Sequence, residues 1–507
     1  MEFHHIVSFS LFIFFLFLTI QNWSRNSKIL KKKLPPGPWR LPIIGSVHHL
    51  TRGTSHRVLR NLSQKYGPIM YLQLGEVPTV VVSSQHMAKQ ILRTHDLAFA
   101  SRSVTMLGKI ICYNCKDIAF SPYSDYWRHM RKLSMLELLS AKMVKSFSSI
   151  HYDELSNLLS SIGSTIGSPI NLSKKLFLFM NASTCRSIFG KTYKNQNELV
   201  MSIQQAVSLS RGFELADLYP SKTFLHGISG MKSKLMKART KVDILLDNII
   251  NVHRENRANG KNCNGESVTE DLIDVFLRVM ESGEFQFPLT NDNIKAIILD
   301  MFVAGSETPC STAIWALSEM MKSPSVIAKA QAEVREVFKG KETCNDDTVL
   351  EKLNYLKLVI KETLRLHPPT PLLVPRECRE ETKIDGFTVP LKSKVLVNVW
   401  AIGRDPMSWE KPECFVPERF ENSSIEFTGN HFQFLPFGAG RRMCPGIHFG
   451  IALVTLPLAY LLYKFDWKLP QGTNLREFDM TKSNGITARR ENDLYLIATH
   501  SLLSLSL

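Results

Sequence analysis

The sequence predicts a mainly helical protein with a small β-rich part and an N-terminal membrane-spanning helix. The longest apolar helical pattern covers residues 293–321, and a second apolar run at 447–462 has the length of a buried helix. Two short runs at 71–74 and 79–82, separated by a turn that holds glycine and proline, predict a β-hairpin. The uncharged run at 6–20 predicts the membrane-spanning helix.

The order of charges around the run at 6–20 favours an uncleaved anchor. A secretory signal peptide carries its positive charge before its apolar core, whereas here the basic residues, from Arg25 to Lys33, come after it. The positive-inside rule then places the rest of the chain in the cytosol. We therefore expect a single-pass anchor at 1–24 in the endoplasmic reticulum membrane. A basic and proline-rich linker at 25–40 follows, because proline fixes φ and removes donors.

Composition narrows the class of protein further. The chain has 507 residues, of which 44% are hydrophobic, and this length alone suggests two or three domains. Its nine cysteines are an odd, scattered set, and Cys112 and Cys115 lie outside any βαβ pattern. We therefore expect reduced thiols rather than a disulfide framework. The net charge of +16 favours a membrane surface or an acidic protein partner, since no nucleic-acid motif is present.

The loop at 437–446 combines three glycines, two arginines and Cys444 just before an apolar helix. The positive end of a helix dipole favours a thiolate at such a position. Gly440 and Gly446 would let flat backbone approach a large planar ligand, and Arg442 offers a cation to an acidic ligand edge. Two other interpretations are an inert buried cysteine and a zinc site. Zinc needs four ligands, and only His448 lies nearby.

The middle of the apolar helix at 293–321 holds an unusual stretch at 304–309. Glu307 and Thr308 are costly inside a buried helix unless they have partners or a function. Pro309 has no N–H for the carbonyl group of Gly305, so we expect the helix to open there. The alternative is a kinked core helix without a chemical role.

Further motifs are common patterns when each is taken alone. Trp127 and Arg131 lie at i and i+4 on a predicted helix, a spacing also typical of surface cation–π pairs. Glu362 and Arg365 lie at i and i+3, the spacing of an ordinary helical salt bridge, and Arg419 follows downstream.

Besides these helices, the sequence predicts two strands, a turn and a long loop. We predict strands at 370–374 and 395–399, with Arg376 two residues after the first, and a turn at 483–487. Residues 101–122 predict a long loop, and long loops often line binding sites.

Together these motifs resemble the cytochrome P-450 family over nearly the whole chain. The loop at 437–446 matches F-x-x-G-x-R-x-C-x-G at every defined position, and 304–309 resembles A/G-G-x-D/E-T-T/S, from which Pro309 departs. The resemblance implies the mainly α cytochrome P-450 fold, with one haem-thiolate monooxygenase domain at 41–507 that includes a small β-rich lobe.

The resemblance also implies roles for individual residues. Cys444 would be the axial ligand of the iron in haem b, and Glu307 and Thr308 would deliver protons to bound O₂. Glu362, Arg365 and Arg419 would form a structural triad. The other expected haem contacts are Trp127, Arg131, Ala304, Gly305, Arg376, Phe437, Gly438, Arg442 and Gly446. The expected substrate pocket consists of Val104, Leu107, Ile110, Ile111, Met301, Val303, Leu372, Leu373 and Ile486.

The activity that the resemblance implies is hydroxylation of a small apolar substrate with O₂ and electrons from NADPH. A flavoprotein, the NADPH–cytochrome reductase, would supply the electrons, since the chain holds no Gly-rich dinucleotide fingerprint. The catalytic unit would be monomeric. The rivals are a reductase-independent haem-thiolate isomerase or dehydratase, which needs no proton relay, and a non-enzymatic membrane haem protein, which needs no oxygen groove.

Several stretches resemble one branch of the family. The anchor, the hinge at 34–38 and the motif at 417–420 are similar to the plant microsomal A-type clan. Residues 364–381 and 465–470 are similar to its terpenoid hydroxylases, above all to sesquiterpene oxygenases of the premnaspirodiene and epi-aristolochene type. A sesquiterpenoid substrate is therefore expected, with diterpenoids, monoterpenoids, alkaloids and flavonoids as alternatives.

Overall fold

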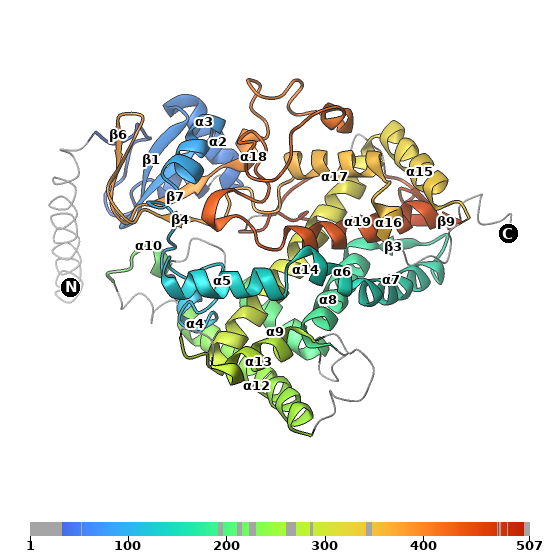
Figure 1. Cartoon of the computed structure of the whole chain (residues 1–507). Coiled ribbons are helices and arrows are strands. Elements are labelled where there is room, and N and C mark those ends of the chain that lie inside the picture. The colour runs from blue at the N-terminus through green and yellow to red at the C-terminus, as the bar shows by residue number, and fades with distance from the viewer. Residues whose placement is uncertain are drawn as a thin grey trace, which may run out of the picture.

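Helices make up most of the chain, and a smaller β-rich lobe lies at one end of the molecule (Figure 1). The computed structural model describes residues 33–51, 53–190, 196–209, 215–222, 230–259, 270–283, 287–340, 347–473, 475, 478–483 and 485–500. The predicted anchor at 1–24 and the first part of the predicted linker lie outside these residues. The mainly helical fold with small sheets is confirmed.

The β-rich lobe is built on the predicted hairpin. Strands β1 (Ile69–Leu74) and β2 (Val77–Val82) pair antiparallel, with Tyr71 opposite Val80. Strand β7 (Lys394–Val397) adds parallel to β2, and β4 (Arg376–Glu377) adds antiparallel to β7. The other elements of this lobe are η1 (Val47–Thr51), α2 (Ser55–Tyr66), α3 (Gln85–Lys89), η2 (Gln90–Thr94), β5 (Thr382–Ile384), β6 (Phe387–Val389) and α18 (Val399–Ile402).

The structure corrects one predicted strand and shortens another. Residues 370–374 form turns, because Pro371 has no N–H for a ladder and Leu373 has a positive φ of 52°. The strand predicted at 395–399 ends at Val397. Asn398 stops it by capping α18, since its side chain accepts a hydrogen bond from the Ala401 N–H.

The helical part carries most of the core. Residues 101–122 form the predicted loop apart from one short helix, α4 (Met106–Ile110). The longer helices are α5 (Asp125–Glu137), α7 (Ser148–Gly163), α8 (Leu172–Phe189), α9 (Gln196–Ser208), α12 (Met231–Ala258), α13 (Leu272–Ser282), α14 (Asn291–Lys322), α15 (Pro324–Phe338), α17 (Asn354–Leu366) and α19 (Ile447–Lys464). The short elements are α6 (Ala141–Ser146), α10 (Leu215–Leu218), α16 (Asp347–Leu350), η3 (Pro417–Phe420) and η4 (Gly440–Arg442), and a sheet of β3 (Pro169–Asn171), β9 (Tyr495–His500) and β8 (Phe465–Lys468).

Helix α14 crosses the middle of the molecule and packs against α8, α17 and α19 (Figure 1). A capping box between Thr290 and Asn293 begins it, which satisfies N–H groups that the first turn leaves free. The opening expected at Pro309 does not break the helix, which continues to Lys322. Close packing on several sides holds the helix together, although proline cannot donate to the carbonyl group of Gly305.

Helix α19 is, among the described residues, the one helix long and apolar enough to cross a membrane. Most of it is buried inside the protein, with Leu453, Leu458 and Leu461 fully inaccessible, as is typical of a core helix. The seven described cysteines are all unpaired, in agreement with the expectation of reduced thiols. Burial raises the pKa of the Cys115 thiol to about 11, so this cysteine is a poor nucleophile.

Candidate active site

A cavity of about 290 Å³ lies between α14, α8, α19 and the loop that precedes α19. One face of α14 lines it with Met301, Ala304, Gly305 and Thr308, which follow the i, i+3, i+4 spacing of one helix face. Ala304 is exposed into this space. The cavity therefore brings the motif at 304–309 against the cysteine loop, about 140 residues away along the chain.

Cys444 lines the cavity at the point where the loop becomes α19. Its backbone N–H donates to the carbonyl oxygen of Phe437 at 2.9 Å, which closes the loop. Burial raises the pKa of the Cys444 thiol, and the Gly446 N–H and Arg131 oppose that rise. The thiolate thus needs a positive partner in the cavity, and a bound metal ion would provide one.

Each glycine of this loop occurs there for a different structural reason. Gly438 and Gly440 have φ values of 70° and 69°, in the left-handed region. A Cβ on Gly440 would lie 2.3 Å from the carbonyl oxygen of Leu92, so this glycine is required by packing against the β-rich lobe. Gly446 has an ordinary φ of −95° and lines the cavity with Gly438 and Phe437.

Four arginines line the cavity: Arg102, Arg131, Arg376 and Arg442. Burial lowers the pKa values of all four, and repulsion by neighbouring arginines lowers those of Arg102, Arg131 and Arg442 further, to about 9 for Arg442. Their one carboxylate ion pair among the described residues joins Arg376 to Asp96 at 2.8 Å. A ligand with acidic groups would relieve this excess of positive charge. Arg102 is not part of any motif, so sequence reasoning missed it.

Backbone carbonyl groups hold the arginines in place. Arg442 donates from Nε to Ala100 O and from Nη2 to Ser121 O, both at 2.6 Å. Arg131 donates to the carbonyl oxygen of Met443. Trp127 does not line the cavity. Its Nε1 donates to Ile118 O at 3.0 Å, and its ring lies 3.9 Å from the Arg442 guanidinium, which it supports by a cation–π contact.

The expected triad forms, but outside the cavity lining. Glu362 accepts hydrogen bonds from Arg365 at 2.7 Å and from Arg419 at 3.0 Å. Arg365 is 1% exposed and also donates to the carbonyl oxygens of Gly403, Pro412 and Cys414. The triad therefore holds the chain at 403–414 against α17.

The side chains of Glu307 and Thr308 in α14 point in different directions. Thr308 lines the cavity, and its hydroxyl donates to the carbonyl oxygen of Ala304 at 2.8 Å. Glu307 is ion-paired with Arg489 and lines a separate small pocket with Cys310 and Ser311. Adjacent helical residues are about 100° apart, so only one of the two faces the cavity.

Only part of the expected substrate pocket lies on the cavity wall. Met301 and Leu373 line the cavity. Val104 is 50% exposed, while Leu107, Ile110 and Ile111 pack in the helical core. Val303 and Leu372 pack against core clusters, and Ile486 is half-buried away from the lining. The apolar lining that sequence reasoning missed includes Ile118, Leu139, Ile188, Phe449 and Val454. Phe449 and Val454 could have been found from the sequence, because both lie in the apolar run at 447–462.

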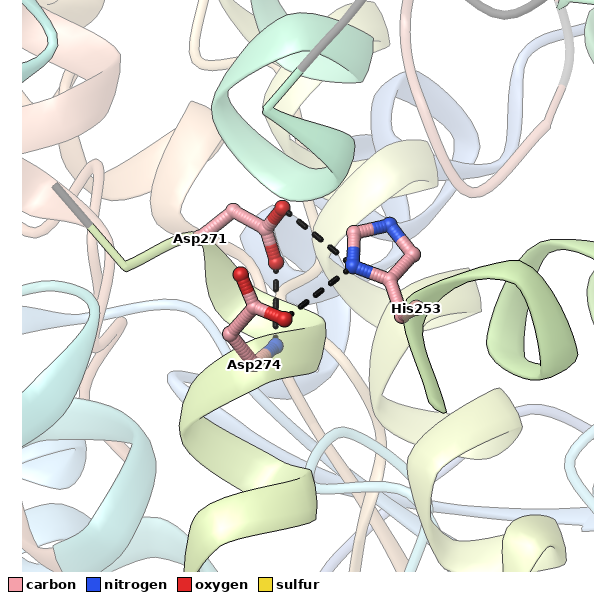
Figure 2. Close-up of side chains that lie close together, drawn as sticks. All are labelled: His253, Asp271 and Asp274. Carbon is pink, nitrogen blue, oxygen red and sulfur yellow. Dashed lines mark hydrogen bonds and ion pairs between the residues drawn. The ribbon is translucent and has the colours of Figure 1, made fainter. Parts of the chain in front are cut away.

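One other cluster of metal-ligating side chains occurs among the described residues, where α12 and α13 meet (Figure 2). His253 Nδ1 lies 3.2 Å from Asp274 Oδ1 and 3.6 Å from Asp271 Oδ2. Asp271 also caps α13 by accepting from the Asp274 N–H at 3.0 Å. Capping and ion pairing account for these groups, which join the two helices.

The donor set of the cavity suits a flat, acidic, metal-bearing ligand. A thiol at a helix N-terminus can hold a metal ion, buried arginines can hold acidic groups, and Ala304 is exposed to the cavity that the thiol also lines. These features define a haem-thiolate protein.

Comparisons with known proteins agree with this class. The family model described as Cytochrome P450 matches residues 35–496. Premnaspirodiene oxygenase of Hyoscyamus muticus is 57% identical over 98% of this chain and 99% of its own length. The 5-epiaristolochene 1,3-dihydroxylase of Nicotiana tabacum is 55% identical over 98% of this chain and 99% of its own length. A zebra fish cytochrome P450 solved with progesterone is 25% identical, with a TM-score of 0.75 over 88% of this chain and 99% of that chain.

The chain therefore belongs to the cytochrome P450 family. It is a haem-thiolate monooxygenase that binds haem b and receives NADPH electrons through a reductase, with O₂ and an organic substrate as reactants.

Proposed function

We propose that this enzyme hydroxylates a sesquiterpenoid hydrocarbon or alcohol. The observation that carries the proposal is the apolar wall of the cavity, which Ile188, Leu373 and Val454 help to form. Burial of apolar ligand surface against such a wall is favourable by roughly 25 cal/mol per Å². The names of the two relatives described above, a premnaspirodiene oxygenase and a 5-epiaristolochene dihydroxylase, support this substrate class.

The positions of the site residues support the roles that we propose for them. Cys444 holds the haem iron from the N-terminus of α19, and Arg131, Arg376 and Arg442 bind the acidic edge of the haem. Bound haem supplies the activation of O₂, which no protein side chain can perform. The apolar wall orients the substrate and excludes water from the reacting C–H bond.

The location and the assembly of the enzyme complete the proposal. The anchor at 1–24 holds it in the endoplasmic reticulum membrane, with the catalytic domain at 41–507 in the cytosol and in contact with membrane lipid. The enzyme acts as a monomeric catalytic unit with the NADPH–cytochrome reductase. The uncharged run at 6–20 and the basic residues that follow it support this topology.

A substrate panel tests the proposed function. The full chain is reconstituted with a plant reductase and NADPH, and it is offered sesquiterpenes, diterpenes, monoterpenes, alkaloids and flavonoids. We expect NADPH-dependent hydroxylation of at least one sesquiterpene, detected by mass spectrometry. Turnover of an alkaloid without turnover of any sesquiterpene would contradict the substrate class, and product formation without NADPH would favour an isomerase or dehydratase.

We expect the Thr308 hydroxyl to take part in the delivery of protons to O₂. Its hydroxyl donates to Ala304 O in this structure, so its lone pairs can accept a hydrogen bond from a water molecule in the cavity. We expect Thr308→Ala to retain haem spectra while product formation falls by about 100-fold, the lower range of general acid–base effects. The readout is the ratio of hydrogen peroxide to product per NADPH.

Thr312→Ala is the matched control for Thr308→Ala. Thr312 lines the same cavity one turn further along α14, and its hydroxyl donates to the carbonyl oxygen of Thr308 at 2.9 Å. This variant should couple nearly as well as the parent. If Thr308→Ala also couples as well as the parent, proton delivery does not pass through this hydroxyl.

A further inference from the structure

The short segment at 117–120 forms one wall of the cavity, and two carboxyl groups connect it to α14. Ile118 and Ala119 line the cavity from this segment, and Asp300 lines it from α14. Asp300 lies one turn before Ala304, on the face of α14 that carries Thr308. The connection therefore sets the distance between the wall at 117–120 and the reaction centre.

Asp300 already accepts two hydrogen bonds from this segment. Its Oδ2 accepts from the N–H groups of Ile118 at 2.7 Å and Ala119 at 2.9 Å. Asp117 makes a similar local bond, because its Oδ2 accepts from the Phe120 N–H at 2.9 Å. These bonds occupy one oxygen of each carboxyl group and leave the other oxygen to be explained.

The remaining oxygen of Asp117 is buried without a partner. Asp117 is 1% exposed, and its Oδ1 has no donor among the described residues. The carboxyl groups of Asp117 and Asp300 lie side by side, because together they accept from the three consecutive N–H groups of Ile118, Ala119 and Phe120. Two ionised carboxylates offer acceptors only, so a bond between them requires one proton. Without that proton, two like charges would face each other in a buried place.

Burial and the charge of Asp300 raise the pKa of Asp117 well above its ordinary value. Burial also raises the pKa of Asp300, to about 6, while the N–H groups of Ala119 and Ile118 oppose that rise. Of the two, Asp300 is therefore the partner that carries the charge, and Asp117 is the partner that carries the proton. This order agrees with the geometry, because Asp300 is the carboxyl group that accepts two backbone N–H groups.

The groups that face the pair do not supply another proton. The thiols of Cys112 and Cys115 stay neutral, since burial raises their pKa values, and the Cys112 thiol offers Asp117 only a weak S–H donor. Tyr126 donates its hydroxyl to the carbonyl oxygen of Lys116. Arg102, the nearest cation, donates to the carbonyl oxygens of Ala119, Val374 and Pro375, and Arg442 donates to those of Ala100, Ile118 and Ser121.

We propose that Asp117 donates a retained carboxyl proton to Asp300, and that this one shared proton fastens the wall at 117–120 to α14. Asp117 and Asp300 are thus positioning residues that set the shape of the substrate chamber. Opening of the wall exposes Asp117 to water, where its carboxyl group ionises and releases the proton. The proposal does not depend on which substrate the enzyme uses.

Because opening of the wall releases a proton, the stability of the closed state depends on pH. Asp117 has a higher pKa in the closed state than in the open state, so the closed state loses stability as pH rises. Above pH 7 only this one proton is released. The equilibrium constant for opening should therefore rise about tenfold per pH unit until the pH reaches the closed-state pKa of Asp117.

Hydrogen exchange on the haem-loaded full chain measures this opening directly. The protection factors of the Ile118 and Ala119 amides, corrected for intrinsic exchange, should fall by about tenfold per unit between pH 7 and pH 9. Asp117→Asn supplies a permanent amide donor, so protection should become independent of pH. Asp300→Asn should end the slope at a lower pH, because the closed-state pKa of Asp117 then loses the contribution of the Asp300 charge but keeps that of burial. Amides in α8 of the same samples report any global opening.

The matched control is Asp125→Asn, an exposed aspartate at the start of α5, which should keep the parental slope. A second readout is the dissociation constant of 4-phenylimidazole, a small apolar haem ligand, from the shift of the Soret band. This dissociation constant should stay constant in Asp117→Asn, and in the parent it should rise at the pH where the open state becomes a measurable fraction of the protein. The proposal is overturned if the protection factors of the parent do not fall with pH, or if those of Asp117→Asn do. Neither measurement requires the sesquiterpenoid assignment.

Discussion

Replacement of Cys444 by Ser should abolish the red-shifted Soret band that the reduced, CO-bound protein shows when a thiolate holds the iron. Serine keeps the size of the side chain, but its hydroxyl does not ionise near neutral pH and offers no soft sulfur ligand. The backbone bond from Cys444 N to Phe437 O should persist, so the loop is expected to fold normally. NADPH-dependent product formation should fall below detection.

The control for this substitution is Cys414→Ser. Cys414 is an exposed free cysteine outside the cavity, so its variant should retain the band and full turnover. CO difference spectra of both variants, measured at equal protein concentration, separate loss of ligation from loss of protein. A Cys444→Ser protein that kept both the band and the turnover would remove Cys444 as the iron ligand.

Glu362→Gln should destabilise the fold strongly, although glutamine keeps the size and shape of the side chain. Glu362 is fully buried and accepts from both Arg365 and Arg419, and its loss leaves the buried Arg365 cation without a charged partner. Removal of one member of a buried ion pair costs about 3–5 kcal/mol. We expect a markedly lower melting temperature and a lower haem content, measured by thermal unfolding and by haem absorbance.

Glu418→Gln is the matched control for the triad. Glu418 lies in η3 next to Arg419 and pairs with Lys329, and both side chains are partly exposed. Exposed pairs contribute about 0–1 kcal/mol, so the melting temperature should change little. If the two glutamine variants unfold at the same temperature, the buried triad does not stabilise the fold as we expect.

The sequence by itself determined the features that depend on residues close together in the chain. The hairpin of β1 and β2, the long helix α14 and the loop-to-helix junction at Cys444 all follow from local spacing. The same local spacing places Glu362 and Arg365 on one helix face. These patterns also carried the resemblance to the cytochrome P450 family, which the comparisons then confirmed.

Only the tertiary structure decided which side chains meet. Arg102 and Asp300 became part of the cavity wall because distant segments pack together there, and no local pattern marks either residue. Glu307 turned toward Arg489, about 180 residues away in sequence, while its neighbour Thr308 faces the cavity. The physical reason is that periodicity defines which face of an element is buried, whereas packing between elements selects the partners that each face contacts.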